Sequence, residues 1–480
     1  MIAWVNARLG LSYPLFRPAP EYALNPFYWL GGLAVVAFLI QGITGVMMML
    51  YYVPSPTQAY SSTLFIFDRV YYGRFLETVH LYTAYAMIML AFMHMMRDYF
   101  VSVHKKPREL MWVVGMFMGF VTLGFGFTGY LLPWTVVSKS ATDVGIGMID
   151  ALPQPLSSFI SYLMVGSGAD SVELLRFYDL HVVVLPAVLL ALLAAKMYML
   201  EVHGISDPST GLKSKEKSQS IPIFPDVTLY LSELAALFGT GMLLLSVLFP
   251  LQLPPEYSPA LAAQSTPQPD WYFLWIYQIL KISIFEGSGL AVALTIVTLV
   301  FVILLLLPFI DRSEKRAMTK RPLYVTIGLI FVAELAVLAL WGYVTPGEII
   351  PLDQAVLTLG GTALLVAAAS YITYRAVTKQ GLSSKKSHSD AGLRVSRGMA
   401  FTVLAAFGSL AIGNSLNGAV ELAMNGVRQL TVEYFLSWLG ILGLVAFATV
   451  YVIYRCEAAS GLLRRRVSIF EIGSGKDGSA

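Results

Sequence analysis

The chain has a single cysteine, Cys456, among its 480 residues. One cysteine cannot form an internal disulfide or a four-cysteine iron–sulfur cluster. Charge is also scarce, because only 13% of the residues are Asp, Glu, Lys or Arg, against about 25% in an ordinary soluble domain. No short apolar segment with a cleavage site opens the chain, so we expect no removable signal peptide. The formal net charge of +3 is small, and we expect no nucleic-acid partner.

Hydrophobic residues make up 57% of the chain, and they form many runs long enough to cross a bilayer. A span needs roughly 20 mostly apolar residues, and in lipid it must be a helix because no water pairs with the backbone. We therefore predict an all-α integral membrane protein with about ten transmembrane helices. The expected spans cover residues 29–52, 76–100, 110–132, 176–201, 228–250, 288–310, 322–344, 353–377, 399–416 and 432–455.

Lys and Arg residues gather in every second connection between these spans. Short basic loops mark the cytoplasmic side of a membrane protein, so we predict a multi-pass protein of the cell membrane with both termini cytoplasmic. Two outer connections, 133–175 and 251–287, are long, and long loops in a compact protein are usually functional. Residues 137–150 and 153–165 of the first connection look like short helices. The basic residues are Lys105, Lys106, Arg108, Lys213, Lys215, Lys217, Arg312, Lys315, Arg316, Lys320, Arg321, Lys379, Lys385, Lys386, Arg394, Arg397 and Arg464–Arg466.

Two histidines, His80 and His94, lie 14 residues apart in the second expected span. At 100° per residue they return to within about 40° of one helix face, separated by about 21 Å of rise. Polar side chains inside a membrane are costly without partners. The spacing favours two haems stacked across the bilayer, one near each surface. The alternative is that both histidines hydrogen-bond to neighbouring helices.

The fourth expected span supplies a facing pair. His181 lies near its outer end, and Lys196 follows 15 residues later, within about 60° of the same face. A neutral imidazole binds haem iron, and a lysine amine can do the same only in the deprotonated form that a metal selects. Alternatively, Lys196 extends to the cytoplasmic surface near Glu201.

Glycines repeat the histidine spacing on the flanking spans. Gly31 and Gly45 are 14 residues apart in the first span, as are Gly115 and Gly129 in the third. Glycine has no Cβ, so a flat macrocycle can lie close to the backbone there. The alternative is that these glycines serve contacts between helices.

Two arginines flank the candidate ligands. Arg97 lies one turn past His94, and Arg176 lies five residues before His181. Each could pair with a haem propionate or anchor a helix end at the membrane interface. The remaining histidines His104 and His388 lie in basic loops, and we expect them to be solvated.

The second long outer connection contains Pro269-Asp270-Trp271-Tyr272. A partly desolvated carboxylate at Asp270 can accept a proton from a bound hydroquinone. Tyr272 can supply a hydrogen bond, and the two rings make an apolar slot for a quinone head group. Tyr130, in Gly129-Tyr130-Leu131-Leu132-Pro133-Trp134, lies at another outer helix end and could form the facing wall.

Together these motifs resemble cytochrome b of the cytochrome bc1 and b6f class. The likeness rests on the histidine and glycine pairs, on Gly129-Tyr130 followed by Pro133-Trp134, on Arg176-Phe177-Tyr178-Asp179-Leu180-His181, and on Pro269-Asp270-Trp271-Tyr272. It covers about residues 15–377, so the two last spans fall outside the common pattern. Some divergent relatives of this kind are prokaryotic or archaeal.

The resemblance implies four domains or segments. Residues 1–210 would form a four-helix di-haem bundle, and 211–377 a C-terminal region with the quinol-site loop. Residues 378–398 would be a linker, and 399–480 an added two-helix segment with a basic tail.

The resemblance also implies the ligands and the reaction. His80 and His181 would bind the outer haem, and His94 with the residue at 196 the inner one. The haems would be b type by default, with a type also known in relatives. Quinol would be oxidised at the Asp270 loop, with one electron passing to a Rieske iron–sulfur protein and the other through both haems, coupled to proton translocation.

The expected partners follow from the same likeness. They are membrane lipid, quinol, the Rieske protein and an electron acceptor such as a cytochrome c, a copper protein or a terminal oxidase. A homodimer within a larger complex is the default by analogy.

The sequence departs from the family pattern at three places. Lys196 stands where the family has histidine, and Asp270 stands where it has glutamate, which shortens the arm by one methylene. At the inner quinone site, Glu201 occupies the position of a family histidine, with His203 two residues on. Glu233 and Asp226 are possible polar groups there.

Two other functions remain as alternatives. A secondary transporter would place binding residues near the midplane of repeated halves, whereas these pairs lie at two depths and no repeat is visible. A cytochrome b-like anchor without quinol chemistry would not require Asp270 and Tyr272.

Overall fold

The computed structural model describes residues 18–20, 23–166, 170–206 and 220–383, except 265 and 267. This part of the chain is mostly helical, with one two-stranded antiparallel sheet. The strands are β1 (Ala19–Pro20) and β2 (Ser220–Ile221). The long helices are α2 (Leu30–Met49), α4 (Gly73–Val101), α5 (Glu109–Leu131), α9 (Leu185–His203), α10 (Thr228–Leu248), α13 (Leu290–Leu305), α15 (Pro322–Val344) and α16 (Leu352–Ser383).

Shorter helices connect these. They are η2 (Pro26–Tyr28), α3 (Ala59–Arg69), α6 (Val136–Asp150), α7 (Leu156–Met164), α8 (Asp170–Asp179), η3 (Leu180–Val184), η4 (Ile223–Val227), α11 (Pro259–Ala262), α12 (Leu274–Leu280), η5 (Ser283–Phe285), η6 (Gly287–Gly289), α14 (Leu307–Ile310) and η7 (Met318–Lys320). The helices α6 and α7 match the two short helices expected in the first long connection. The helices α3, α11 and α12 were not predicted, because short segments with mixed polarity carry little periodicity.

Seven helices of the described part are long and apolar enough to cross a membrane. They agree with expected spans one to five, seven and eight, and the last two expected spans lie outside the described residues. The sixth differs, since α13 ends at Leu305, before the predicted end of the span. Proline cannot donate to the carbonyl four residues earlier, and Pro308 leaves the Leu304 carbonyl to accept a hydrogen bond from Trp112 Nε1 (2.8 Å).

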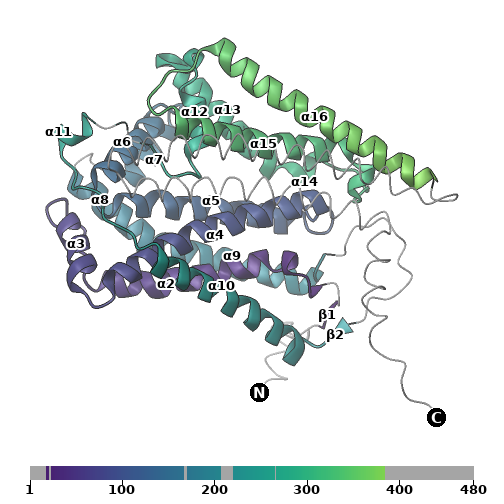
Figure 1. Cartoon of the computed structure of the whole chain (residues 1–480), viewed down its shortest axis with the longest axis horizontal. Helices are drawn as coiled ribbons and strands as arrows, with labels where there is room; N and C mark the ends of the chain where they lie inside the picture. Colours follow the sequence, from purple (N-terminus) through teal and green to yellow (C-terminus); the bar gives the residue numbers. More distant parts are fainter. Residues whose placement is uncertain are drawn as a thin grey trace.

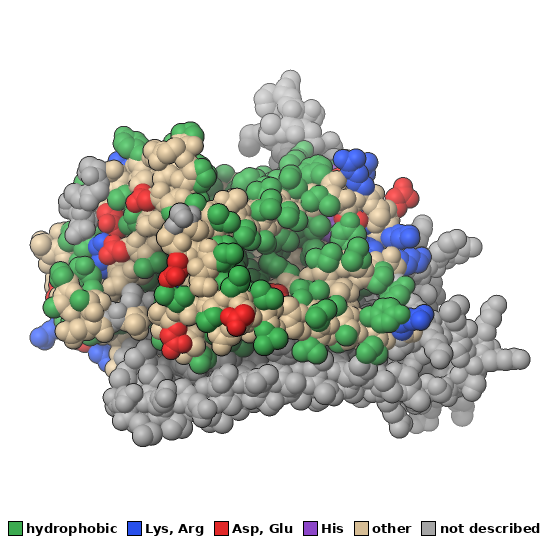
Figure 2. Space-filling model, turned by 90° about the horizontal axis from the view of Figure 1, so that it is seen from above, with side chains coloured by type: hydrophobic (Ala, Val, Ile, Leu, Met, Phe, Trp, Pro, Cys, Tyr) green, Lys and Arg blue, Asp and Glu red, His purple; other side chains and the backbone are tan. Residues whose placement is uncertain are grey.

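The helices α4 and α5 lie at the centre of the described part (Figure 1). The helices α2, α9 and α10 flank them on one side, and α15 and α16 lie on the other. Hydrophobic side chains cover much of the face drawn in Figure 2, and several Lys and Arg side chains gather at its right-hand end. An apolar belt between charged ends is what a bilayer selects. His80 lies toward one end of the bundle, the His80 end, and His94 lies toward the other, the His94 end.

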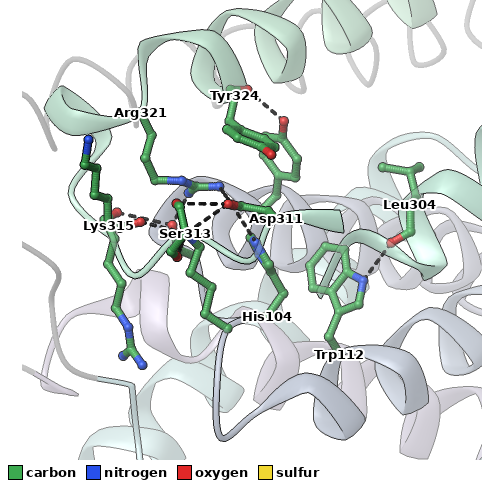
Figure 3. A network of polar contacts seen from close by, with 12 residues as sticks. His104, Trp112, Leu304, Asp311, Ser313, Lys315, Arg321 and Tyr324 are labelled. Atoms are coloured by element: carbon green, nitrogen blue, oxygen red, sulfur yellow. Dashed lines mark hydrogen bonds and ion pairs between the residues drawn. The ribbon is translucent and has the colours of Figure 1, made fainter. Parts of the chain in front are cut away.

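The prediction that His104 is solvated was wrong. Its side chain is fully buried and lies in a polar network at the His94 end (Figure 3). His104 Nε2 lies 3.4 Å from Asp311 Oδ2, and Lys105 Nζ lies 3.1 Å from Asp311 Oδ1. Arg321 pairs with the same carboxylate. The network forms because the loop after α14 folds over the loop after α4, a contact that the composition of one loop does not reveal.

Candidate functional site

The helices α4 and α9 bring the candidate ligands together in two pairs. The rings of His80 and His181 have their centroids 6.4 Å apart. Lys196 Nζ lies 3.2 Å from His94 Nε2. The expected side chains therefore lie together at both ends of the bundle, and Lys196 contacts His94.

The position of His181 has a local cause. Pro186 in the first turn of α9 cannot donate a backbone hydrogen bond, and the chain just before it forms one π-helical turn, Leu180–Val184. An inserted π turn rotates the side chains that precede it relative to those that follow. The turn contains His181 and precedes Lys196, so it sets the angle between the two residues.

Each histidine at the His80 end is held by a threonine hydroxyl. Thr44 Oγ1 lies 2.8 Å from His80 Nδ1 and donates its proton to the Ile40 carbonyl (2.8 Å). Thr128 Oγ1 lies 3.1 Å from His181 Nδ1 and donates to the Gly124 carbonyl (2.8 Å). A hydroxyl has one proton, so each ring must donate from Nδ1. That tautomer leaves the Nε2 lone pair free, as binding of a metal requires.

The glycines of α2 and α5 face these two rings. A Cβ atom at position 45 would lie 3.5 Å from His80 Cε1, and one at position 129 would lie 3.0 Å from His181 Nδ1. A side chain at Gly129 would therefore clash with the His181 ring, and one at Gly45 would be in van der Waals contact with the His80 ring. The two rings also lie close enough that both would hold one haem iron, since their centroids are 6.4 Å apart.

The other two glycines face the pair at the His94 end. A Cβ atom at Gly31 would lie 3.1 Å from His94 Nε2, and one at Gly115 would lie 3.1 Å from Lys196 Nζ. His94 Nδ1 is buried and has no hydrogen-bond partner in the described part of the chain. The two 14-residue intervals thus place one glycine against each of the four candidate ligands.

A cavity of about 320 Å³ opens at the His94 end. His94, Lys196 and both glycines line it, together with apolar side chains such as Phe38 and Leu193. The cavity has the donor set and the apolar walls that a haem needs, so the residues present fit the group.

The same cavity has a charged end. Arg97 and Arg108 line it beside Asp98. Arg97 Nη1 donates to Asp98 Oδ1 (2.8 Å), and Arg108 Nη2 donates to the His203 carbonyl (3.0 Å). For Arg97 the sequence left two alternatives, a propionate partner or an anchor at the membrane interface, and its place in the cavity favours the first. Arg108 was missed, although it belongs to the basic loop used for orientation.

Arg176 is placed differently from Arg97. Its Nη1 donates to the carbonyls of Tyr162 (2.7 Å) and Leu163 (3.1 Å) at the end of α7. This placement favours the anchoring alternative, in which Arg176 fastens α8 to α7. At the expected inner quinone site, Glu201 Oε1 is buried and has no hydrogen-bond partner among the described residues, Asp226 and Glu233 included.

The Asp270 loop forms a second polar cluster, toward the His80 end. Tyr85 OH donates to Asp270 Oδ1 (2.8 Å), and Tyr272 OH donates to Asp270 Oδ2 (3.1 Å). The Trp271 and Tyr272 side chains are buried. Burial raises the pKa of the Asp270 carboxyl to about 6, although the two hydroxyls oppose the shift.

Tyr272 connects this cluster to α5. A Cβ atom at Gly126 would lie 2.7 Å from Tyr272 OH, and Gly129, which faces His181, follows one turn later. Burial, then Asp270 and Tyr130, raise the pKa of Tyr272 well above its ordinary value. Tyr130 was predicted as the facing wall, and it lies close enough to act on Tyr272. Tyr85 was missed, because only its place among apolar residues five positions after His80 distinguishes it.

These features define a class of protein, an integral membrane helical bundle with a cradle for a flat cofactor between α4 and α9 and a carboxylate near one end. Two family models match the chain, cytochrome b(N-terminal)/b6/petB over residues 85–259 and cytochrome b(C-terminal)/b6/petD over residues 261–360.

Individual relatives agree with the family models. The cytochrome bc complex cytochrome b subunit of Chlorobaculum thiosulfatiphilum is 35% identical over 70% of this chain and 78% of its own length. Cytochrome b of Sulfolobus acidocaldarius is 32% identical over 76% of this chain and 69% of its own length. A chain of a solved hyperthermophilic respiratory Complex III is 25% identical, with a TM-score of 0.61, and the match covers 78% of this chain and 98% of that one.

The chain belongs to the cytochrome b family and is the cytochrome b subunit of a bc- or b6f-type quinol-oxidising complex. It is thus a multi-pass membrane protein of a family that binds haem and quinone.

Proposed function

We propose that this cytochrome b holds two haems, one between His80 and His181 and one between His94 and Lys196. The observation that carries the proposal is that each of these four side chains faces one of four glycines on α2 and α5. Helix–helix packing alone gives no reason for a glycine opposite every candidate ligand. When bound, the haems supply one-electron carriers at two depths of the membrane.

The protein's own residues prepare each ligand. Thr44 and Thr128 hold His80 and His181 in the tautomer whose Nε2 can bind iron. Lys196 reaches His94 from the opposite helix and would bind through the lone pair of its neutral amine. Arg97 and Arg108 are placed to pair with propionates at the charged end of the cavity.

We propose that Asp270 is the base of quinol oxidation. Oxidation of a quinol to a quinone releases two electrons and two protons, and an ionised Asp270 can accept one of the protons. A carboxyl with a pKa of about 6 is largely ionised at neutral pH and still binds a proton readily. Tyr272 orients the carboxylate, and Trp271 and Tyr130 contribute walls of the quinol slot.

The remaining assignments complete the proposed reaction. One electron passes to a Rieske iron–sulfur protein, and the other crosses the membrane, coupled to proton translocation. The His80 end faces outward and both termini are cytoplasmic, as the basic loops at the His94 end suggest. The Rieske protein passes its electron to a cytochrome c, a copper protein or a terminal oxidase, and the subunit works within a homodimer.

The experiment on haem binding is a pyridine haemochrome assay with redox titration of the purified complex. The wild type should contain two haems per chain. Lys196→Ala should lose or shift only one component, because His80 and His181 do not depend on Lys196. Lys196→His should keep both components, since imidazole supplies the same kind of lone pair.

His181→Ala is the matched variant at the other end, and it should affect the other component. If both redox components are unchanged in Lys196→Ala, Lys196 is not a ligand. A wild-type preparation without haem, made with adequate iron and porphyrin, would refute the entire assignment.

A further inference from the structure

Asp270 is held by two phenols from different parts of the chain. Tyr272 comes from its own loop and donates to Oδ2 (3.1 Å), whereas Tyr85 comes from α4 and donates to Oδ1 (2.8 Å). One hydroxyl therefore reaches each carboxylate oxygen. In the described part of the chain no cation lies within ion-pair distance of this carboxylate, so the phenols are what stabilises its charge.

Tyr85 is also fixed in place by the surrounding rings. It lies five residues after His80 on the same helix. Its ring packs edge-on against those of Trp271 and Tyr272, with ring centroids 6.5 Å and 6.3 Å apart, respectively. The side chain is half-buried. An aspartate has only two side-chain torsions, so a donor at each oxygen leaves the carboxylate little freedom to turn.

We propose that Tyr85 is a positioning residue that sets the pH at which quinol oxidation becomes active, by keeping Asp270 ionised and aligned. The inference rests on the proposed role of Asp270 as the base. A hydrogen bond from a hydroxyl favours the charged form of a carboxyl, and bonds to charged groups are stronger than bonds to neutral ones. Without the Tyr85 hydroxyl, Asp270 holds its proton to a higher pH.

The groups around Asp270 allow the assignment to be tested cleanly. The titratable groups that face it are Tyr85 from α4 and Tyr272 from its own loop, with Tyr130 of α5 acting on Tyr272. Trp271 and Tyr272 pack in one hydrophobic cluster with apolar residues of α13 and α15, among them Val297 and Ala336. Both phenols stay neutral in the pH range where a carboxyl titrates.

The experiment is the pH dependence of quinol oxidation by the purified complex carrying Tyr85→Phe. The acidic limb should move to higher pH by roughly one unit, so that the rate at pH 6 falls several-fold while the rate at high pH changes little. The matched control is Tyr82→Phe. Tyr82 lies on the same helix, but its hydroxyl donates to the Phe249 carbonyl (2.7 Å), so the acidic limb should not move.

A second measurement follows the carboxyl itself. The infrared carbonyl band that disappears in Asp270→Asn should titrate at higher pH in Tyr85→Phe than in the wild type. An acidic limb that stays in place, or a rate that falls equally at every pH, would overturn the role of Tyr85. If Asp270→Asn oxidises quinol at the wild-type rate, the proposed function itself fails.

Discussion

Two aspartates, the half-buried Asp270 and the buried Asp311, lie toward opposite ends of the bundle and have opposite surroundings. Toward the His80 end, Asp270 accepts hydrogen bonds from the hydroxyls of Tyr85 on α4 and Tyr272, and no cation among the described residues pairs with it. Asp311 contacts the loop after α4 at the His94 end and meets Arg321, Lys105 and His104 (Figure 3). The same kind of side chain thus forms the proposed proton site at one end and joins two loops at the other.

The different neighbours give the two carboxyls different proton affinities. Burial raises the pKa of Asp270 to about 6. Burial would also raise that of Asp311, but the charges of Arg321 and Lys105 hold the pKa of Asp311 below its ordinary value. Burial and the charge of Arg321 lower the pKa of His104 to about 4, so the ring stays neutral at physiological pH. An aspartate among hydroxyls can exchange protons, whereas one among cations stays ionised.

The largest expected effect is the loss of stability in Asp311→Asn. Removing this charge leaves Arg321 and Lys105 buried without their shared partner, which typically costs about 3–5 kcal/mol. The melting temperature of the purified complex should fall markedly, while quinol oxidation per intact complex stays near the wild-type rate.

The control for this variant is Asp68→Asn. Asp68 pairs with Arg74 at 3.0 Å, but both side chains are about half exposed, and such a pair contributes ~1 kcal/mol or less. Equal destabilisation by the two variants would show that Asp311 is not a tie between the segments.

Asp270→Asn should have the opposite effects: it should lower activity and leave stability nearly unchanged. The amide cannot accept a proton, so quinol oxidation should fall roughly 100-fold or more. Haem content and melting temperature should change little, because the amide oxygen can still accept a hydrogen bond from a tyrosine. Steady-state turnover and a haemochrome assay on the same preparation measure both. A parallel loss of haem would contradict the assignment of Asp270 to proton transfer.

In the wild type, a smaller effect should distinguish the two carboxyls: turnover should depend on pH through Asp270, and stability through Asp311. A base must be deprotonated to act, so turnover should fall about tenfold for each pH unit below about pH 6. The stability that Asp311 contributes is present above its unfolded pKa and is lost only as the pH falls through its lower folded pKa. Initial rates and melting temperatures between pH 5 and 8 test this. An acidic limb near pH 4, the ordinary range of aspartate, would exclude a raised pKa at Asp270.

Local periodicity explains what could be predicted from the sequence. The intervals of 14 residues between His80 and His94 and between the glycines place side chains on one helix face whatever the tertiary structure. Seven expected spans match long helices, because hydrophobic length determines a transmembrane helix. The pairing of His94 with Lys196 was expected from the resemblance to cytochrome b, because helix geometry gives each residue a face but does not place two helices side by side.

Contacts between distant segments could not be predicted in this way. Tyr85 and Asp270 are separated by 185 positions, and His104 and Asp311 by 207. Nothing in the local sequence of either partner shows that the other will meet it. The same applies to Arg176, whose carbonyl partners on α7 depend on how two short helices fold together.

The unbroken length of α4 has a further consequence. His80, Tyr85, His94 and Arg97 all project from this one helix of 29 residues. The distance between two residues of one helix is set by the rise per residue. Movement of the loops at either end therefore leaves the separation of the two ring pairs unaltered. The separation of the two proposed haem sites is therefore fixed by this single helix, and Tyr85 connects the proposed base Asp270 to the same helix.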